Sequence, residues 1–342
     1  MQYTNVVIFG GAGFIGQHFA HHLLDKGKAR NIWLADIRRL NVPLKEKQLE
    51  KFIMEKKVIH IEVDVRRRIT SESLPARDVD LIVNLAAVHR EPGHEPLEYY
   101  ETNLLGARNI CMWAESVNCD NMLFTSSIAP YGPSETIKTE ESIPVPITPY
   151  GGSKLVAETI HLAWQWSDRH NRKLVIVRPG VVFGPGEGGN VARLIKAVLH
   201  GAFFYMGNRT TRKAGGYVKE LCYTMEWALD QTSLKDESIL LYNFSMDPPP
   251  SIEEYVESIK LVANQKRAIL SVPYSMVLSG AFCLQFFAKL FSVENSFSPV
   301  RIRKLVRSNN IVPRELQKRG CQYKYTLRAA LEEWRNDRPD EW

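Results

Sequence analysis

The sequence lacks the cysteine patterns of a disulfide-bonded or zinc-binding protein. Its five cysteines are odd in number, scattered along the chain and without C-x-x-C spacing. We therefore expect free thiols in a reducing compartment, the cytoplasm, and no metal site. The first residues, MQYTNVVIFGG, contain no basic segment and no small-residue cleavage site, so we expect no signal peptide.

Nucleic-acid motifs and low-complexity tracts are also absent. With 44% hydrophobic and 24% charged residues, the composition is typical of a soluble globular protein. The net charge of +6 is modest, and basic residues gather between Pro299 and Lys324 against a single acid, Glu315. Without interleaved aromatics this cluster argues against a nucleic-acid partner, and it favours the phosphates of a small ligand or an anionic membrane surface.

Long hydrophobic runs are scarce, and only residues 270–288 form an extended uncharged stretch. Pro273 and Gln285 weaken this stretch as a membrane-spanning helix, and Lys289 ends it. We favour a buried or interface helix here over peripheral contact with a membrane.

Apolar, β-branched runs alternate with segments of helical period through the first half of the chain. This alternation predicts an α/β fold with a doubly wound parallel sheet, the Rossmann type. We expect a dinucleotide-binding Rossmann domain over 1–184, to which 217–246 returns through a late strand, ILLYNFS. Residues 185–342 are expected to form a smaller, mostly helical substrate-binding domain.

A glycine turn follows the first expected strand. Gly10, Gly13 and Gly16 lie between that strand and a helix, where they permit a tight turn, close approach of a pyrophosphate and close helix–strand packing. The N-terminus of the helix then offers N–H groups to the phosphates. The sequence therefore predicts a dinucleotide site.

The expected second strand ends in Asp36, twenty residues after Gly16. A carboxylate at this position accepts hydrogen bonds from the ribose hydroxyls and repels a 2′-phosphate, which favours NAD over NADP. Arg38 and Arg39 follow directly and keep NADP open.

Tyr150 and Lys154 form a Y-x-x-x-K pair, which by itself is a weak signal. An ammonium one helical turn from a phenol favours the ionised phenolate, so the pair suits acid–base work on an alcohol or a ketone. The Tyr150–Lys154 pair indicates an active site only in combination with the dinucleotide turn earlier in the chain.

Several ordered motifs together give the chain a specific resemblance. They are GGAGFIG at 10–16, VDV at 63–65, NLAA at 84–87, TSSIAPYG at 125–132, PYGGSK at 149–154, RPGVVFGPG at 178–186 and GYVKEL at 216–221. In this combination the chain resembles the extended short-chain dehydrogenase/reductase superfamily, within its NAD-dependent nucleotide-sugar epimerase/dehydratase family. The resemblance covers most of the chain and implies a nucleotide-sugar substrate and a homodimer built through two paired helices.

The resemblance also implies roles for individual residues. Tyr150 and Lys154 match the acid–base pair, and Ser127 matches the hydroxyl that holds the substrate. The expected cofactor-binding residues are Gly10, Gly13, Phe14, Ile15, Gly16, Asp36, Asp64, Val65, Leu85, Ala86, Ala87, Asn103, Tyr150, Lys154 and Pro179. The expected substrate-binding residues are Ser127, Tyr150, Asn190, Arg193, Lys213, Tyr217 and Arg301.

The reaction type is less sharply defined by the sequence. Family dehydratases carry an Asp-Glu pair where Ile128 and Ala129 stand here, which argues against dehydration. We expect an epimerase that works through a transient keto sugar, with a 4-keto-sugar nucleotide reductase as the alternative. Val181 replaces an asparagine found in many epimerases, and Asn190 is the expected substitute. An enzyme resembling 3β-hydroxysteroid dehydrogenases, acting on an apolar alcohol, is the alternative from another substrate class.

Overall fold

A computed structural model describes residues 2–40, 44–91, 93–234, 237–290 and 306–342; beyond 282 in the fourth range only the backbone is described. Its main feature is a seven-stranded, fully parallel sheet in the order β11-β7-β5-β4-β1-β2-β3. The strands are β1 (Tyr3–Phe9), β2 (Ala29–Asp36), β3 (Val58–Glu62), β4 (Val79–Asn84), β5 (Asn121–Thr125), β7 (Lys173–Pro179) and β11 (Ile239–Phe244). This sheet confirms the predicted doubly wound α/β fold.

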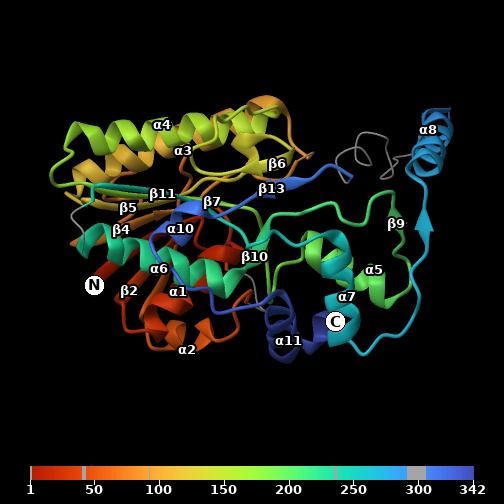
Figure 1. The fold of residues 1–342 in the computed structure, drawn as a ribbon. Coiled ribbons are helices and arrows are strands. Elements are labelled where there is room, and N and C mark those ends of the chain that lie inside the picture. Colours follow the sequence, from red (N-terminus) through yellow and green to blue (C-terminus); the bar gives the residue numbers. More distant parts are fainter. Residues whose placement is uncertain (1, 41–43, 92, 235–236, 291–305) are drawn as a thin grey trace.

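Helices cover both faces of the sheet (Figure 1). On one side α3 (Pro96–Ser116) packs beside α4 (Pro149–Ser167), and on the other α1 (Phe14–Asp25) packs beside α6 (Val218–Leu234), with α2 (Leu49–Met54) next to α1. Burial on both faces explains why the strands read as continuous apolar runs. All carboxyl ends of the parallel strands meet at one edge, where ligands bind in this class of fold.

Local signals set where the key helices begin. Thr148 caps α4 by accepting a hydrogen bond from the Gly151 N–H at 3.1 Å, and Pro149 occupies the first turn, where its missing N–H costs nothing. Helix α3 begins with a capping box between Glu95 and Glu98. Strand β4 is shorter than the sequence suggested, because residues 85–87 leave the sheet as a loop at its carboxyl edge.

A smaller part of the chain lies beyond the carboxyl edge of the sheet and consists of short strand pairs and helices (Figure 1). The pairs are β10 (Gly215–Tyr217) with β8 (Val181–Phe183), β12 (Ser271–Val272) with β9 (Tyr205–Met206), and β13 (Asn309–Ile311) with β6 (Ser134–Lys138). The helices of this smaller part are α5 (Asn190–Leu199), α7 (Ile252–Val262), α8 (Tyr274–Leu290) and α11 (Leu327–Asp337), and the 3₁₀ turns are η1 (Ala129–Tyr131) and η2 (Pro339–Glu341). Helix α10 (Arg314–Lys318) instead packs against β11 of the sheet. Among the described residues, no helix is long and apolar enough to cross a membrane.

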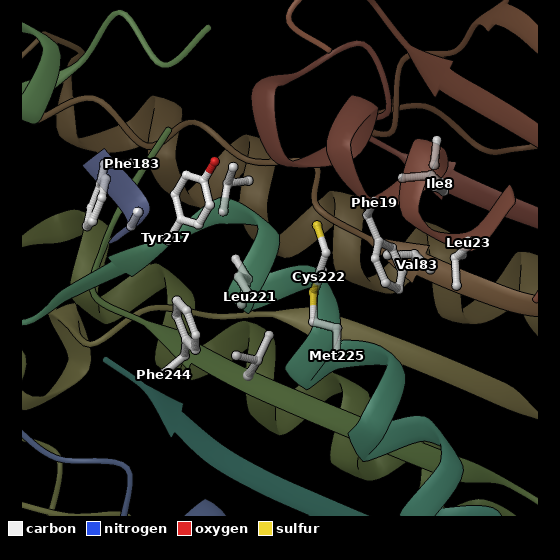
Figure 2. Packing of buried hydrophobic residues seen from close by; sticks show 14 of the residues in the cluster. Ile8, Phe19, Leu23, Val83, Phe183, Tyr217, Leu221, Cys222, Met225 and Phe244 are labelled. Atoms are coloured by element: carbon white, nitrogen blue, oxygen red, sulfur yellow. The ribbon is translucent and has the colours of Figure 1, made fainter. Parts of the chain in front are cut away.

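One continuous hydrophobic core joins the sheet to this smaller part (Figure 2). Phe19 of α1 packs in it beside Cys222 and Met225 of α6, and Tyr217 and Phe244 extend it toward the smaller part. Helix α6 thus contributes to both regions, so packing fixes the carboxyl edge of the sheet relative to the elements that face it.

Candidate active site

The glycine turn after β1 approaches the loop after β4 so closely that no side chain fits. Gly10 has φ of +75°, and a Cβ atom there would lie 2.7 Å from the Ala86 nitrogen. A Cβ at Gly16 would lie 2.7 Å from Gly11, which explains how α1 packs directly against the turn. Phe14 and Ile15 start α1, so their backbone N–H groups belong to the first helical turn, which has no intrahelical acceptors. This cradle fits the pyrophosphate of a dinucleotide.

Asp36 lies at the end of β2, directly beside this turn. Its carboxylate accepts hydrogen bonds from the Ala12 N–H at 3.2 Å and the Arg38 N–H at 2.9 Å. The exposed Arg38 guanidinium returns to the same carboxylate, with Nε 3.4 Å from Oδ1. These bonds hold the carboxylate in a fixed position, as expected for the predicted ribose contact, and Arg38 lies against it and neutralises part of its charge.

The remaining predicted cofactor residues line the same edge. The Leu85 N–H donates to the Phe9 carbonyl at 2.9 Å, so residues 85–87 continue alongside the glycine turn. Asp64 pairs with Arg66 at 2.8 Å, and Val65 packs against Gly106, where a Cβ would lie 2.9 Å from Val65 Cγ2.

Asn103 supports the loop instead of facing it. Its side-chain oxygen accepts from the Val88 N–H at 3.0 Å, and its nitrogen donates to the Val88 carbonyl and, at 2.8 Å, to Ser153 Oγ. These bonds occupy the amide, so its role is to hold the loop after β4 against α4. Pro179 ends β7, and its carbonyl accepts from the Ile128 N–H at 3.1 Å.

Tyr150, Lys154 and Ser127 come together where β5 and α4 meet. The Ser127 side chain lies close enough to the Tyr150 hydroxyl to lower its pKa, and Ser127 Oγ accepts from the Ala129 N–H at 3.1 Å. Lys154 Nζ donates to the carbonyl of Thr125, the last residue of β5, at 2.8 Å. A phenol, a hydroxyl and an amine thus converge beside the dinucleotide turn.

Burial controls the protonation of this pair. Lys154 is only 3% exposed, and burial lowers its pKa to about 7, against the opposing charge of Glu158. Burial raises the pKa of Tyr150 to about 12, and the Ser127 side chain opposes that shift. In the protein alone the phenol of Tyr150 therefore keeps its proton at neutral pH, whereas Lys154 gains or loses its proton close to neutral pH.

A buried histidine lies below the lysine, and sequence reasoning missed it. His161 stacks on Phe124 at 4.0 Å between ring centroids, and Lys154 Nζ lies 4.8 Å from the centroid of the same ring. His161 Nδ1 donates to the Ala157 carbonyl at 2.7 Å, so its other nitrogen accepts from Asn84 at 3.2 Å. Burial, together with the charge of Lys154, lowers the pKa of His161 to about 4, which keeps the ring neutral.

A buried ion pair fixes the next turn of α4. Arg178 of β7 donates to both carboxylate oxygens of Glu158, at 2.8 and 2.6 Å, and to the Tyr131 hydroxyl at 2.7 Å. Ser126 also donates to Glu158. A bidentate, fully hydrogen-bonded pair of this kind holds α4 at one position against β5 and β7. The sequence contained a signal for Glu158 and His161, because both follow Tyr150 and Lys154 at helical spacing along one face of the helix.

The predicted substrate residues are distributed over several elements. Arg193 donates to the Asn190 side chain at 2.7 Å, which places both at the start of α5. Lys213 Nζ donates to the Arg307 carbonyl at 2.5 Å. Tyr217 is 0% exposed and contacts Phe183 and Tyr325, so the structure places it in the core instead of at a substrate surface. Arg301 lies outside the described residues.

Among the described residues, no group of His, Cys, Asp or Glu side chains could hold a metal ion.

Residues 6–241 match the NAD dependent epimerase/dehydratase family, whose cofactor fits the cradle at Gly10 and Asp36. The chain is 28% identical, over 96% of its length and 93% of the relative's, to the N-acetyl-α-D-glucosaminyl-diphospho-ditrans,octacis-undecaprenol 4-epimerase of Escherichia coli O157:H7.

Two further similarities extend along most of the chain. It is 24% identical, over 90% of each chain, to the decarboxylating sterol-4-α-carboxylate 3-dehydrogenase of Candida albicans. The structure of the UDP-glucuronic acid 4-epimerase from Bacillus cereus in complex with NAD superposes with a TM-score of 0.76 at 18% identity, over 98% of this chain and 99% of that one. That superposition confirms the fold.

We predict that Gly10→Ala weakens NAD binding by roughly tenfold or more. The new methyl group would clash with Ala86 and force apart the two loops that form the cradle. Gly27→Ala is the matched control, because Gly27 also has positive φ (+63°) but a Cβ there meets nothing within 4 Å. Both variants carry the same backbone strain, so calorimetric titration with NAD should separate them, and equal affinities would contradict the assignment.

We also predict that Lys154 makes stability depend on pH. Its pKa is about 7 in the folded protein and 10.5 when unperturbed, so between these values the unfolded chain binds a proton that the folded one does not. The free energy of unfolding should therefore rise with pH, by at most about 1.4 kcal/mol per unit. Lys154→Met should remove this contribution and the exposed control Lys51→Met should not, as measured by urea unfolding between pH 7 and 9. A constant difference between wild type and Lys154→Met over this range would refute the buried-lysine account.

Proposed function

Because the chain belongs to the NAD dependent epimerase/dehydratase family, we propose that it is a 4-epimerase of a sugar carried on a diphosphate. The observation that carries this proposal is the convergence of Ser127, Tyr150 and Lys154 beside the dinucleotide cradle. The relative that matches along nearly the whole chain is a 4-epimerase of a diphosphate-linked sugar.

The surroundings of Ser127 support epimerisation over dehydration. Elimination of water needs an additional acid and base next to the reacting carbon. Ile128 is buried in a small cluster with Tyr131, Ala214 and Ile311, and the N–H of Ala129 donates to Ser127. The two residues after Ser127 thus provide packing and a backbone donor, but no carboxylate.

The proposed reaction follows from these positions. Ser127 holds the C4 hydroxyl of the sugar, and Tyr150 removes its proton as the carbon becomes a ketone. Bound NAD⁺, which the cradle at Gly10 and the Asp36 carboxylate would hold, would supply a reversible hydride acceptor for C4. Lys154, when protonated, favours the phenolate of Tyr150, which counters the rise that burial causes in its pKa. Tyr150 then returns the proton, so the enzyme ends the cycle unchanged.

We propose that the two parts of the chain divide this work. Residues 1–184, joined by 217–246, hold the cofactor and the catalytic pair. Residues 185–342 hold the sugar diphosphate, with Asn190 and Arg193 on α5 and Lys213 before β10 as the polar groups that face it. Two cations suit the charge of a diphosphate.

Tyr150→Phe should lower epimerisation by about 10³-fold while leaving NAD affinity intact, because only the proton-transferring hydroxyl is lost. The assay is NMR of the product after incubation with UDP-N-acetylglucosamine or with N-acetylglucosamine on a polyprenyl diphosphate. Tyr100→Phe on the neighbouring helix α3 is the matched control and should retain activity. A C4 epimer formed without net cofactor consumption supports the proposal, whereas stoichiometric oxidation of NADH would identify a reductase instead.

We also propose a homodimer formed through α3 and α4, whose outer surface carries the exposed apolar residues Leu105, Met112, Val156 and Trp166. Sedimentation velocity should give twice the chain mass of 39.1 kDa. The double variant Met112→Glu/Val156→Glu should sediment as a monomer, because it buries charge in the interface. Ile143→Glu, at an exposed apolar site outside the two helices, should remain dimeric; a monomeric wild type would disprove the dimer.

A further inference from the structure

Up to residue 282, where its side chains are described, helix α8 buries one narrow side against the rest of the protein. Val277 and Ala281, one helical turn apart, are buried and pack with Phe204 and Met206. In Figure 1 the helix stands at the outer end of the molecule, far from the sheet. Of the two predicted alternatives, a buried or an interface helix, the buried one is wrong for the described part of α8, because most of its described side chains are exposed.

The outward surface of this region is uncharged and carries large apolar side chains beside the small exposed residues Ser275, Ser279 and Gly280. Met276 and Phe282 on α8 are 66% and 49% exposed, and Leu270 just before it is 76% exposed. The sequence has no charged residue from 268 to 288. An uncharged, outward-facing helix of this kind has an unfavourable free energy in water, so such surfaces mark interaction sites.

Basic residues flank the uncharged segment on both sides. Lys266 and Arg267 precede it and are exposed, and Lys289 ends it. From there to position 307 the sequence contains one acid, Glu294, against the basic residues Lys289, Arg301, Arg303, Lys304 and Arg307. An apolar helix bordered by cations is suited to the surface of an anionic bilayer, where the apolar side chains enter the headgroup region and the cations contact the lipid phosphates.

The chain that leaves α8 returns to the candidate active site. Strand β13, which follows, pairs with β6, and Lys213 Nζ donates to the Arg307 carbonyl at 2.5 Å. Lys213 is one of the residues proposed to face the diphosphate. Fifteen residues of sequence, 291–305, separate α8 from the next described residues on the substrate side of the site.

We propose that α8 rests on the surface of an anionic lipid bilayer and holds the substrate side of the active site next to it. The helix lies on the membrane without crossing it. A sugar diphosphate anchored in that bilayer by a polyprenyl chain would then reach the site without leaving the lipid; this part rests on the proposed function, whereas the membrane contact does not.

The test is cosedimentation of the full-length protein with vesicles of phosphatidylcholine containing about 30% phosphatidylglycerol. The wild type should bind these vesicles, and binding should weaken in pure phosphatidylcholine and in about 0.5 M salt. Met276→Glu/Phe282→Glu should reduce the bound fraction at least about tenfold, because carboxylates on this face oppose both contacts. Leu261→Glu, at an exposed leucine on α7, is the matched control and should bind like the wild type.

Two results would overturn the proposal. One is absence of vesicle binding by the folded wild type, or binding that the α8 variant leaves unchanged. The other is an oligomer that the α8 variant dissociates while no vesicles bind, which would mean that a second copy covers the helix. Melting curves verify that the variant folds. Epimerisation of UDP-N-acetylglucosamine by the α8 variant should match the wild type. If neither protein epimerises this substrate while the wild type still binds vesicles, the result counts against the proposed function alone.

Discussion

The attachment of α4 to the ends of β5 and β7 is the constraint on which the rest of the site depends. Lys154 is bound to the Thr125 carbonyl, and one turn later Glu158 is locked to Arg178. These contacts fix the rotation of the helix, and therefore the direction in which Tyr150 points. A displacement of this helix by a fraction of a turn would separate the phenol from Ser127 and from the dinucleotide cradle.

Much of this arrangement could be predicted from the sequence, because its signals are local. The glycine turn, Asp36 and the Tyr150–Lys154 spacing each report a backbone shape or a short-range pairing, and the alternation of strands and helices determines the sheet. Tertiary burial is what the sequence did not reveal. Tyr217 looked like a polar contact but lies in the core. The uncharged segment 270–288 was predicted as a buried or interface helix, and its described side chains exclude the buried alternative, because apolar composition alone does not say which surface covers a helix.

The buried polar face of α4 also shows that tertiary burial is not apparent from the sequence, here for residues that proved important and were not predicted. His161 and Glu158 follow the catalytic pair at helical spacing, yet they are identified only when the strands beneath them are in place. His161 is neutral because burial, together with the charge of Lys154, lowers its pKa, and the bonds to Ala157 and Asn84 fix which ring nitrogen carries the proton. A neutral ring avoids adding a second positive charge beside Lys154. The site thus combines a cradle that the fold alone largely explains with charges that the buried face of α4 controls.

In the reaction that we propose, the hydrogen on C4 of the sugar leaves as hydride and returns to the same carbon while Tyr150 carries the proton. The most direct test follows deuterium from a C4-deuterated N-acetylglucosamine diphosphate substrate through complete epimerisation, with NMR detection of the product. The account predicts that deuterium stays at C4 of the epimer, with no incorporation of hydrogen from the solvent at that carbon. Loss of the label to the solvent would show that C4 is deprotonated instead, and would contradict the account.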